Sequence, residues 1–164
     1  MASRTPTRTS APSPSRQVAS FIAKFDPTIA RIVRAARSKL RARYPSAHEL
    51  VYDNYNALAI GYAPSERTSE AFVSLAVFAR GVNLYFIQGR KLADPKGLLQ
   101  GEGSQGAFVR VESAAVLDGK DVIGLLESAV AFGTTPLASS GRGRTIVQSI
   151  SAKQRPRRLP AKKR

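Results

Sequence analysis

Apolar residues recur every three or four positions in the first part of the chain. Residues 18–25 form a short apolar stretch that ends at Asp26-Pro27, where aspartate is a natural helix cap and proline suits the first helical position. The next apolar residues fall on one helical face, with arginines on the other; they are Ile29, Ile32, Val33, Ala36 and Leu40. This pattern predicts a short helix and then a long one that stops at Pro45.

From Leu50 onward the period changes to two, which is typical of strands. Strands are predicted at residues 50–55, 58–62, 72–79, 82–87 and 109–112, with tight turns at Asn56-Ala57 and Arg80-Gly81. Asp118 is predicted to cap a final helix that Gly133 ends. The order of helices, a strand meander and a helix predicts an α+β domain with a mostly antiparallel sheet of five or six strands.

Two segments do not fit this scheme. Residues 88–107 contain five of the twelve glycines and no sustained period, so we expect a turn-rich loop held to the core by Leu92, Leu98 and Leu99. Residues 145–151 contain Ile146, Val147 and Ile150, and this composition predicts an additional edge strand.

Charge divides the chain into three parts. The net charge is +15, and all eleven acidic residues lie between Asp26 and Glu127. Residues 1–17 contain three arginines and almost no large apolar side chain, whereas residues 134–164 contain nine basic residues. We therefore predict a disordered basic tail at 1–17, one α+β domain at 18–133, and a basic tail at 134–164 that includes the possible edge strand.

Composition limits the chemistry. The chain has no cysteine, which excludes disulfides, thiolate metal sites and cysteine nucleophiles. His48 is the only histidine, and we interpret it as an ordinary loop or strand-entry residue after Pro45. No apolar stretch approaches the ~20 residues of a membrane helix. We expect a cytoplasmic protein without membrane contact, assign no catalytic or metal-binding residue, and favour a non-enzymatic role.

The alternation of side chains along the strands predicts a candidate ligand site. If Val73, Leu75, Val77, Val82, Leu84 and Phe86 face the helices, the opposite face carries a mixture of apolar, amide and phenol groups that suits a small ligand or a protein. The glycine loop satisfies a Gly-x-Gly-x-x-Gly spacing but lacks the flanking strand and helix of a dinucleotide site. The candidate ligand-binding residues are Tyr52, Asn54, Asn83, Tyr85, Gly101, Gly103 and Arg110.

The basic C-terminal segment predicts a second kind of contact. A flexible polycation can neutralise phosphates and release counterions, and Arg31, Arg34 and Arg41 on the long helix extend this charge. The alternative is a solvated arm that aids solubility. The candidate nucleic-acid-binding residues are Arg142, Arg144, Lys153, Arg155, Arg157, Arg158, Lys162, Lys163 and Arg164.

Several ordered blocks resemble the YdhG-like family, also grouped as domain of unknown function 1801. They are Val51-Tyr52-Asp53-Asn54-Tyr55-Asn56-Ala57-Leu58, Val82-Asn83-Leu84-Tyr85-Phe86-Ile87-Gln88-Gly89, and Asp94-Pro95-Lys96-Gly97-Leu98-Leu99-Gln100-Gly101 running on to Val109-Arg110. The resemblance covers roughly residues 18–130. It implies the α+β fold of that family, and it implies a metal-carrying role because some relatives are described as frataxin-like iron chaperones.

Three hypotheses follow, in this order. The first is a non-enzymatic binding module with an unidentified ligand or protein partner. The second is a nucleic-acid-associated accessory protein that binds phosphates non-specifically through its tails. The third, by family analogy, is an iron or metal chaperone. The sequence identifies no cofactor and leaves the oligomeric state open.

Overall fold

The structure, a computed structural model, describes residues 12–161. Three α-helices, six strands and three short 3-10 helices follow one another along these residues. The helices are α1 (Pro14–Ala23), α2 (Pro27–Arg43) and α3 (Lys120–Phe132). The strands are β1 (His48–Asp53), β2 (Leu58–Ala63), β3 (Val73–Phe78), β4 (Gly81–Phe86), β5 (Ala107–Val111) and β6 (Thr145–Ile150). The 3-10 helices are η1 (Thr68–Glu70), η2 (Gly89–Lys91) and η3 (Ala114–Asp118).

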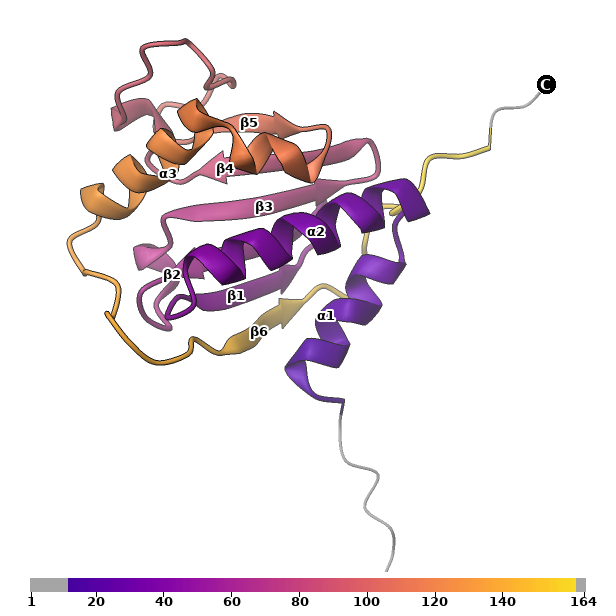
Figure 1. The fold of residues 1–164 in the computed structure, drawn as a ribbon. Coiled ribbons are helices and arrows are strands. Elements are labelled where there is room, and N and C mark those ends of the chain that lie inside the picture. Colours follow the sequence, from indigo (N-terminus) through magenta and orange to yellow (C-terminus); the bar gives the residue numbers. More distant parts are fainter. Residues whose placement is uncertain (1–11, 162–164) are drawn as a thin grey trace, which may run out of the picture.

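The six strands form one sheet in the order β5-β4-β3-β2-β1-β6. Neighbours from β5 to β1 are antiparallel, and β6 pairs with β1 in parallel. The helices cover one face of the sheet, with α2 lying along its middle (Figure 1). The predicted α+β class with a mostly antiparallel sheet is confirmed.

Local sequence explains where the first two helices begin and end. The Ser13 side chain caps α1 by accepting a hydrogen bond from the amide of Arg16, and the Asp26 side chain caps α2 by accepting one from the amide of Thr28 at 2.9 Å. A proline follows each cap, where its missing N–H has no cost. The helix α2 ends at Arg43, with Tyr44 at its C-cap, and so stops before Pro45 as predicted. The helix α1 starts at Pro14, so it takes in the last residues of the predicted tail at 1–17; residues 1–11 of that tail lie outside the described residues.

The core lies between the sheet and the helices. Across β3 and β4, the residues predicted to face the helices are all fully buried; they are Val73, Leu75, Val77, Val82, Leu84 and Phe86. Residues of α2 such as Val33, Ala36 and Leu40 pack in the same cluster. In the glycine-rich segment, Leu92, Leu98 and Leu99 pack against this cluster, as expected from the sequence.

The prediction for the start of the last helix is wrong by one residue. The helix α3 begins at Lys120 with Gly119 at its N-cap, and Asp118 is the last residue of η3. The carboxylate of Asp118 accepts a hydrogen bond from Lys39 Nζ at 2.6 Å instead of capping the helix. Asp118 therefore pairs with a lysine of α2 and does not cap α3.

The edge strand predicted at residues 145–151 is confirmed as β6, which lies beside β1 at the edge of the sheet. The segment beyond it differs from the predicted basic tail, because Arg157 is only 6% exposed. The physical reason lies on the helix-facing side of β1, where Glu49 and Asp53 are 2% and 0% exposed and require hydrogen-bond donors. The segment after residue 144 supplies some of these donors. Residues 162–164 lie outside the described residues.

Candidate anion-binding cleft

A cleft of about 480 Å³ opens between the second half of α2, the start of β1 and the segment that leads into β6. Its lining is rich in guanidinium groups. The lining residues are Arg34, Arg37, Ser38, Arg41, Ala42, Tyr44, Pro45, Ala47, Glu49, Arg142, Gly143 and Thr145. Four arginines and one carboxylate therefore share one hollow.

The helical repeat explains why three of these arginines face the cleft. Arg34, Arg37 and Arg41 are separated by three and four residues, so they lie along one side of α2. The apolar side of the same helix packs on the sheet through residues such as Val33 and Leu40. Burial of one helix side thus fixes the direction of the other.

The fourth arginine comes from the opposite wall, which is tied to the start of β1. The amide of Gly143 donates to the carbonyl of Pro45 at 2.9 Å, and the amide of Arg144 donates to His48 Nδ1 at 3.0 Å. A side chain at Gly143 would overlap the carbonyl of Ala47, so only glycine fits this approach. These contacts hold Arg142 at the cleft, and His48 serves as the strand-entry residue that the sequence predicted.

Glu49 forms the floor of the cleft and is almost completely buried. Its Oε2 accepts hydrogen bonds from Arg37 Nε and the Tyr62 hydroxyl, both at 2.8 Å. Its Oε1 accepts from Arg37 Nη2 at 2.9 Å and from Thr145 Oγ1 at 2.7 Å. Both oxygens of this carboxylate are therefore fully used, and the bidentate pair with Arg37 fixes the arginine in one geometry.

These contacts shift the pKa values in the network. Burial alone would raise the pKa of Glu49, but hydrogen bonds from Arg37, Thr145 and Tyr62, together with the Arg37 charge, hold it below its ordinary value of 4.5. Burial and the neighbouring carboxylate raise the pKa of Tyr62 well above its ordinary value. Glu49 is thus a charged acceptor and Tyr62 a neutral donor at neutral pH.

Positive charge exceeds negative charge in the cleft. Glu49 neutralises Arg37, and Arg41 Nη1 lies 3.7 Å from Glu49 Oε1 with 42% of its side chain exposed. Within residues 12–161, Arg34 and Arg142 form no ion pair with a carboxylate. The hydroxyl of Tyr44, another lining residue, is buried without a hydrogen-bond partner among the described residues. The cleft therefore offers uncompensated guanidinium groups to an anion.

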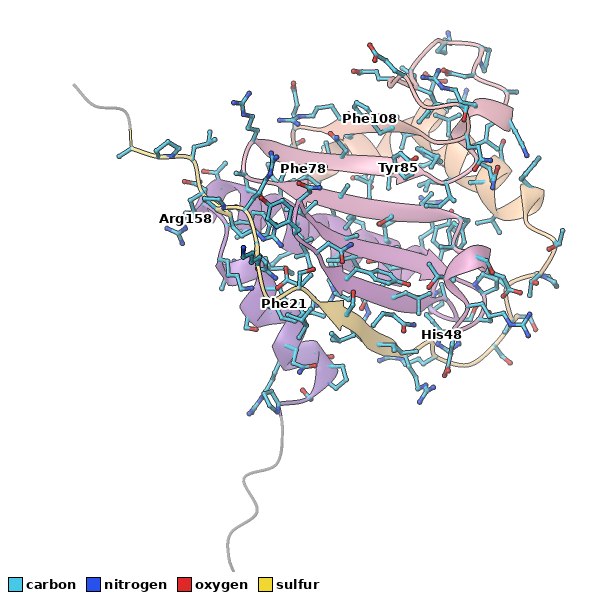
Figure 2. All side chains as sticks on the ribbon, turned by 180° about the vertical axis from the view of Figure 1, so that it is seen from behind. Phe21, His48, Phe78, Tyr85, Phe108 and Arg158 are labelled. Carbon is cyan, nitrogen blue, oxygen red and sulfur yellow. The ribbon has the colours of Figure 1, made fainter. Side chains whose placement is uncertain are left out.

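The ligand-binding residues predicted on the sheet are spread from β1 to β5: Tyr52 lies on β1, Asn83 and Tyr85 on β4, and Arg110 on β5. Figure 2 shows the sheet from the side opposite to Figure 1, with Tyr85 labelled. Tyr52 bonds through its hydroxyl to Thr68, and Asn54 Oδ1 accepts from Ser149 Oγ at 3.4 Å. Asn83 is half-buried with its amide oxygen unpartnered among the described residues, and Arg110 Nη2 donates to the carbonyl of Arg80 at 2.6 Å. The structure does not gather these residues around the cleft.

The glycine loop covers part of the sheet face that carries Tyr85. Gly106 lies against the Tyr85 hydroxyl so closely that any side chain there would overlap it. Gly101 has a positive φ of 113° and lies beside the Phe108 ring, and the carbonyl of Gly103 accepts from Arg90 Nε at 3.1 Å. A purely structural interpretation of these glycines, as turn and close-approach positions, accounts for their contacts.

Several predicted nucleic-acid-binding residues have partners inside the domain. Arg144 pairs with Glu66, Arg157 Nη2 donates to Asp53 Oδ1 at 2.9 Å, and Arg158 Nε donates to the carbonyl of Lys24 at 3.1 Å. The prediction that Arg157 belongs to a solvated tail is therefore wrong. Lys153 and Arg155 are exposed, Arg142 lines the cleft, and Lys162, Lys163 and Arg164 lie outside the described residues.

Three of the four cleft arginines are predicted from the sequence, but in other roles. Arg34 and Arg41 are predicted on an exposed helix face and Arg142 in a tail, and no sequence pattern indicates that the three lie together. The pairing of Arg37 with Glu49 is not predicted. Their one local signal is a carboxylate in the apolar start of β1, where a buried charge requires a partner.

Comparison with known proteins adds no relative. No family model, curated protein or solved structure matches the chain. The resemblance to the YdhG-like family therefore stays a prediction, as does the metal-chaperone role that it implies. Among residues 12–161, no three histidine, aspartate or glutamate side chains gather as a metal site would require. Within the same residues, no helix has the length and apolar character to cross a bilayer.

Proposed function

We propose that this protein is a non-enzymatic binding module that takes a phosphate-bearing ligand into the cleft between α2 and the segment before β6. The observation that carries the proposal is the convergence of four arginines on one hollow with a single, fully engaged carboxylate. Guanidinium groups match phosphate oxygens in geometry and charge, and a partly enclosed site strengthens the attraction.

The network around Glu49 favours binding over proton transfer. Glu49 is charged at neutral pH and has both oxygens occupied by donors, so it is poorly placed to accept a proton from a ligand. Its physical role is to hold Arg37 in place. The remaining arginines, Arg34, Arg41 and Arg142, are then the groups that contact the ligand.

Calorimetric titration with inorganic pyrophosphate tests the proposal. We expect saturable binding that weakens with salt, and a loss of about tenfold or more on Arg34→Gln or Arg142→Gln, because each removes a charge-assisted hydrogen bond. The matched control is Arg31→Gln, which removes an exposed arginine one helical turn earlier on α2, outside the cleft.

Glu49→Gln gives a second measurement. It keeps the shape of the side chain but frees Arg37 from its carboxylate, so pyrophosphate should bind more tightly than to the unaltered protein. The proposal fails if Arg31→Gln weakens binding as much as Arg34→Gln does, or if the unaltered protein does not bind pyrophosphate.

A second candidate function, non-specific association with nucleic acid, rests on the exposed side of α2. This helix contains five arginines, one lysine and no acidic residue, and Arg31, Arg34 and Arg41 are all exposed. Such a row can lie along a phosphate backbone. The basic residues at the two ends of the chain would add to it.

Salt dependence of duplex DNA binding tests this second function in the full chain. If the last three basic residues contact phosphates, changing Lys162, Lys163 and Arg164 to glutamine should lower the log-log salt slope by roughly 0.9 for each phosphate that is no longer neutralised. Deleting residues 134–164 is unsuitable as a test, because it would also remove β6 from the sheet. An unchanged slope would remove these three residues from the proposed interface.

A further inference from the structure

Exposed aromatic and basic side chains meet at the end of the sheet farthest from the arginine cleft. The cleft lies where β1 begins, whereas β1 and β3 end at turns on the opposite side. Tyr55, in the turn after β1, is 48% exposed, and Phe78, the last residue of β3, is 36% exposed. Figure 2 shows Phe78 toward the same end as Arg158 and away from His48.

An arginine side chain lies at each of these two turns. Arg155 lies 5.7 Å from the centroid of the Tyr55 ring, and its amide donates to the Tyr55 carbonyl at 2.8 Å. Arg110 crosses Gly81, the residue paired with Phe78, to reach the carbonyl of Arg80. We call Tyr55, Phe78, Arg80, Arg110 and Arg155 the turn-end patch.

Gly81 is the reason that Arg110 can cross the turn that follows Phe78. Its φ is 152°, in the region that favours glycine, and a side chain there would overlap the Arg110 guanidinium. The patch extends from β5 to the turn that joins β1 and β2. Four strand spacings make its span roughly 19 Å, enough for several nucleotides.

One carboxylate at this end of the sheet is neutralised. Asp53 is buried and paired with Lys24 and Arg157. Asp26, which caps α2, and Glu112, which follows β5, are exposed and form no ion pair among the described residues. The patch itself contains three arginines and no carboxylate, so it is complementary to a polyanion.

We propose that the turn-end patch binds single-stranded nucleic acid, with bases stacked on Tyr55 and Phe78 and phosphates paired with the three arginines. Unstacked bases and a phosphate backbone are the ligand groups that exposed rings and guanidinium groups accept together. A duplex buries its bases and offers the phosphates alone. This proposal does not depend on the arginine cleft.

Fluorescence anisotropy of the full chain with an oligothymidylate of about 12 nucleotides, and with a duplex of equal length, tests the proposal. We expect tighter binding of the single strand. Phe78→Ala and Tyr55→Ala should each weaken single-strand binding by about 5- to 150-fold, the loss of one stacked base, and should leave duplex binding unchanged. Tyr55→Phe, which keeps the ring, should bind as the unaltered protein does.

Phe132→Ala is the matched control, because this ring is also exposed and lies near a cation, Lys91, but belongs to the end of α3. The cleft proposal is tested with pyrophosphate and this one with the preference for single strands, so failure of the cleft proposal and failure of this one are separable. Equal loss in Phe132→Ala and Phe78→Ala, or no single-strand preference, overturns the proposal. It is also overturned if Phe78→Ala weakens binding to phosphatidylserine vesicles but not to the oligonucleotide.

Discussion

Strand β1 carries two buried carboxylates on its helix-facing side, and the two ends of the strand use them differently. Glu49 pairs with Arg37 inside a hollow that holds three further arginines. Asp53 pairs with Lys24 and Arg157, and the Arg157 guanidinium packs 5.6 Å from the centroid of the Phe25 ring. The unpaired arginines of the cleft can bind an anion, whereas the ion pairs of Asp53 hold the C-terminal segment against the domain.

Hydrogen bonding reinforces the contrast. Around Asp53, the Gln154 side chain donates to the Asp53 carbonyl at 3.0 Å, and Lys24 Nζ donates to Gln154 Oε1 at 3.0 Å. Burial acts to raise the pKa of Asp53, but the bonds from Lys24, Gln154 and Arg157 hold it below its ordinary value of 3.8. Both carboxylates are charged, and the arginines around Glu49 include Arg34 and Arg142, which line the cleft without an ion pair among the described residues.

Removing the Glu49 carboxylate should have the largest effect. Glu49→Ala leaves Arg37 half-buried without its partner and the Tyr62 hydroxyl without an acceptor, so we expect a loss of about 3–5 kcal/mol in the free energy of unfolding. Urea denaturation followed by circular dichroism measures it. The control is Glu127→Ala at an exposed position of α3, with a change within about 0.5 kcal/mol. A similar loss in both variants would contradict the assigned role of Glu49.

At the other end of β1, Arg157→Ala should cost less, about 1–3 kcal/mol, because Lys24 remains as a partner of Asp53. The variant should also make the segment after β6 more sensitive to limited proteolysis. Arg155→Ala, at an exposed position two residues earlier, serves as the control for stability. If proteolysis of the segment is as slow in Arg157→Ala as in the control, Arg157 does not fasten it.

Acid should lower the free energy of unfolding through both carboxylates of β1, since the pKa values of Glu49 and Asp53 are lowered in the folded state. The unfolded chain then binds protons more strongly than the folded one, so stability rises with pH in the acid range. This contribution is complete above the ordinary values of 4.5 for Glu49 and 3.8 for Asp53 and is lost as pH falls through the lower folded values. Urea midpoints measured between about pH 6 and about pH 3 should fall, and Glu49→Gln should flatten only part of that fall. A slope unaffected by Glu49→Gln would show that other carboxylates cause it.

The smallest effect is expected for an ion pair that lies on the surface. Lys39→Ala breaks the 2.6 Å pair with Asp118, in which both side chains are exposed, and should cost only about 0–1 kcal/mol. Thermal unfolding is sufficient to compare it with Arg157→Ala. A loss of stability equal to that of Arg157→Ala would mean that burial does not determine how much an ion pair contributes to stability.

Local patterns are sufficient to predict most of the fold. The 3.6-residue period of α2 and the two-residue period of β3 and β4 depend on neighbours in sequence, and each correctly identifies the buried face. The composition of residues 145–151 indicates a strand, but not that β6 runs parallel to β1, because that pairing joins segments about a hundred residues apart. Asp118 shows the limit of local rules, since a tertiary ion pair takes the place of the expected cap.

The candidate site is harder to predict than the fold. Arg37 and Glu49 lie on different elements, and Arg157 and Asp53 are farther apart still, so no spacing in the sequence marks either pair. A basic segment rich in proline and arginine has the composition of a solvated tail. It is held to the domain because buried carboxylates on β1 stabilise particular arginines in it.

The placement of β6 also bears on the order of events during synthesis. Thr145 and Arg157 donate hydrogen bonds to Glu49 and Asp53. Both residues leave the ribosome after every other strand and helix of the domain has been made. Until then the outer edge of β1 lacks its β6 partner, Glu49 lacks the Thr145 hydroxyl and Asp53 lacks Arg157. Final consolidation of this protein is therefore a late step in its biogenesis, and a nascent chain stalled before residue 145 would expose the sheet edge that β6 later protects.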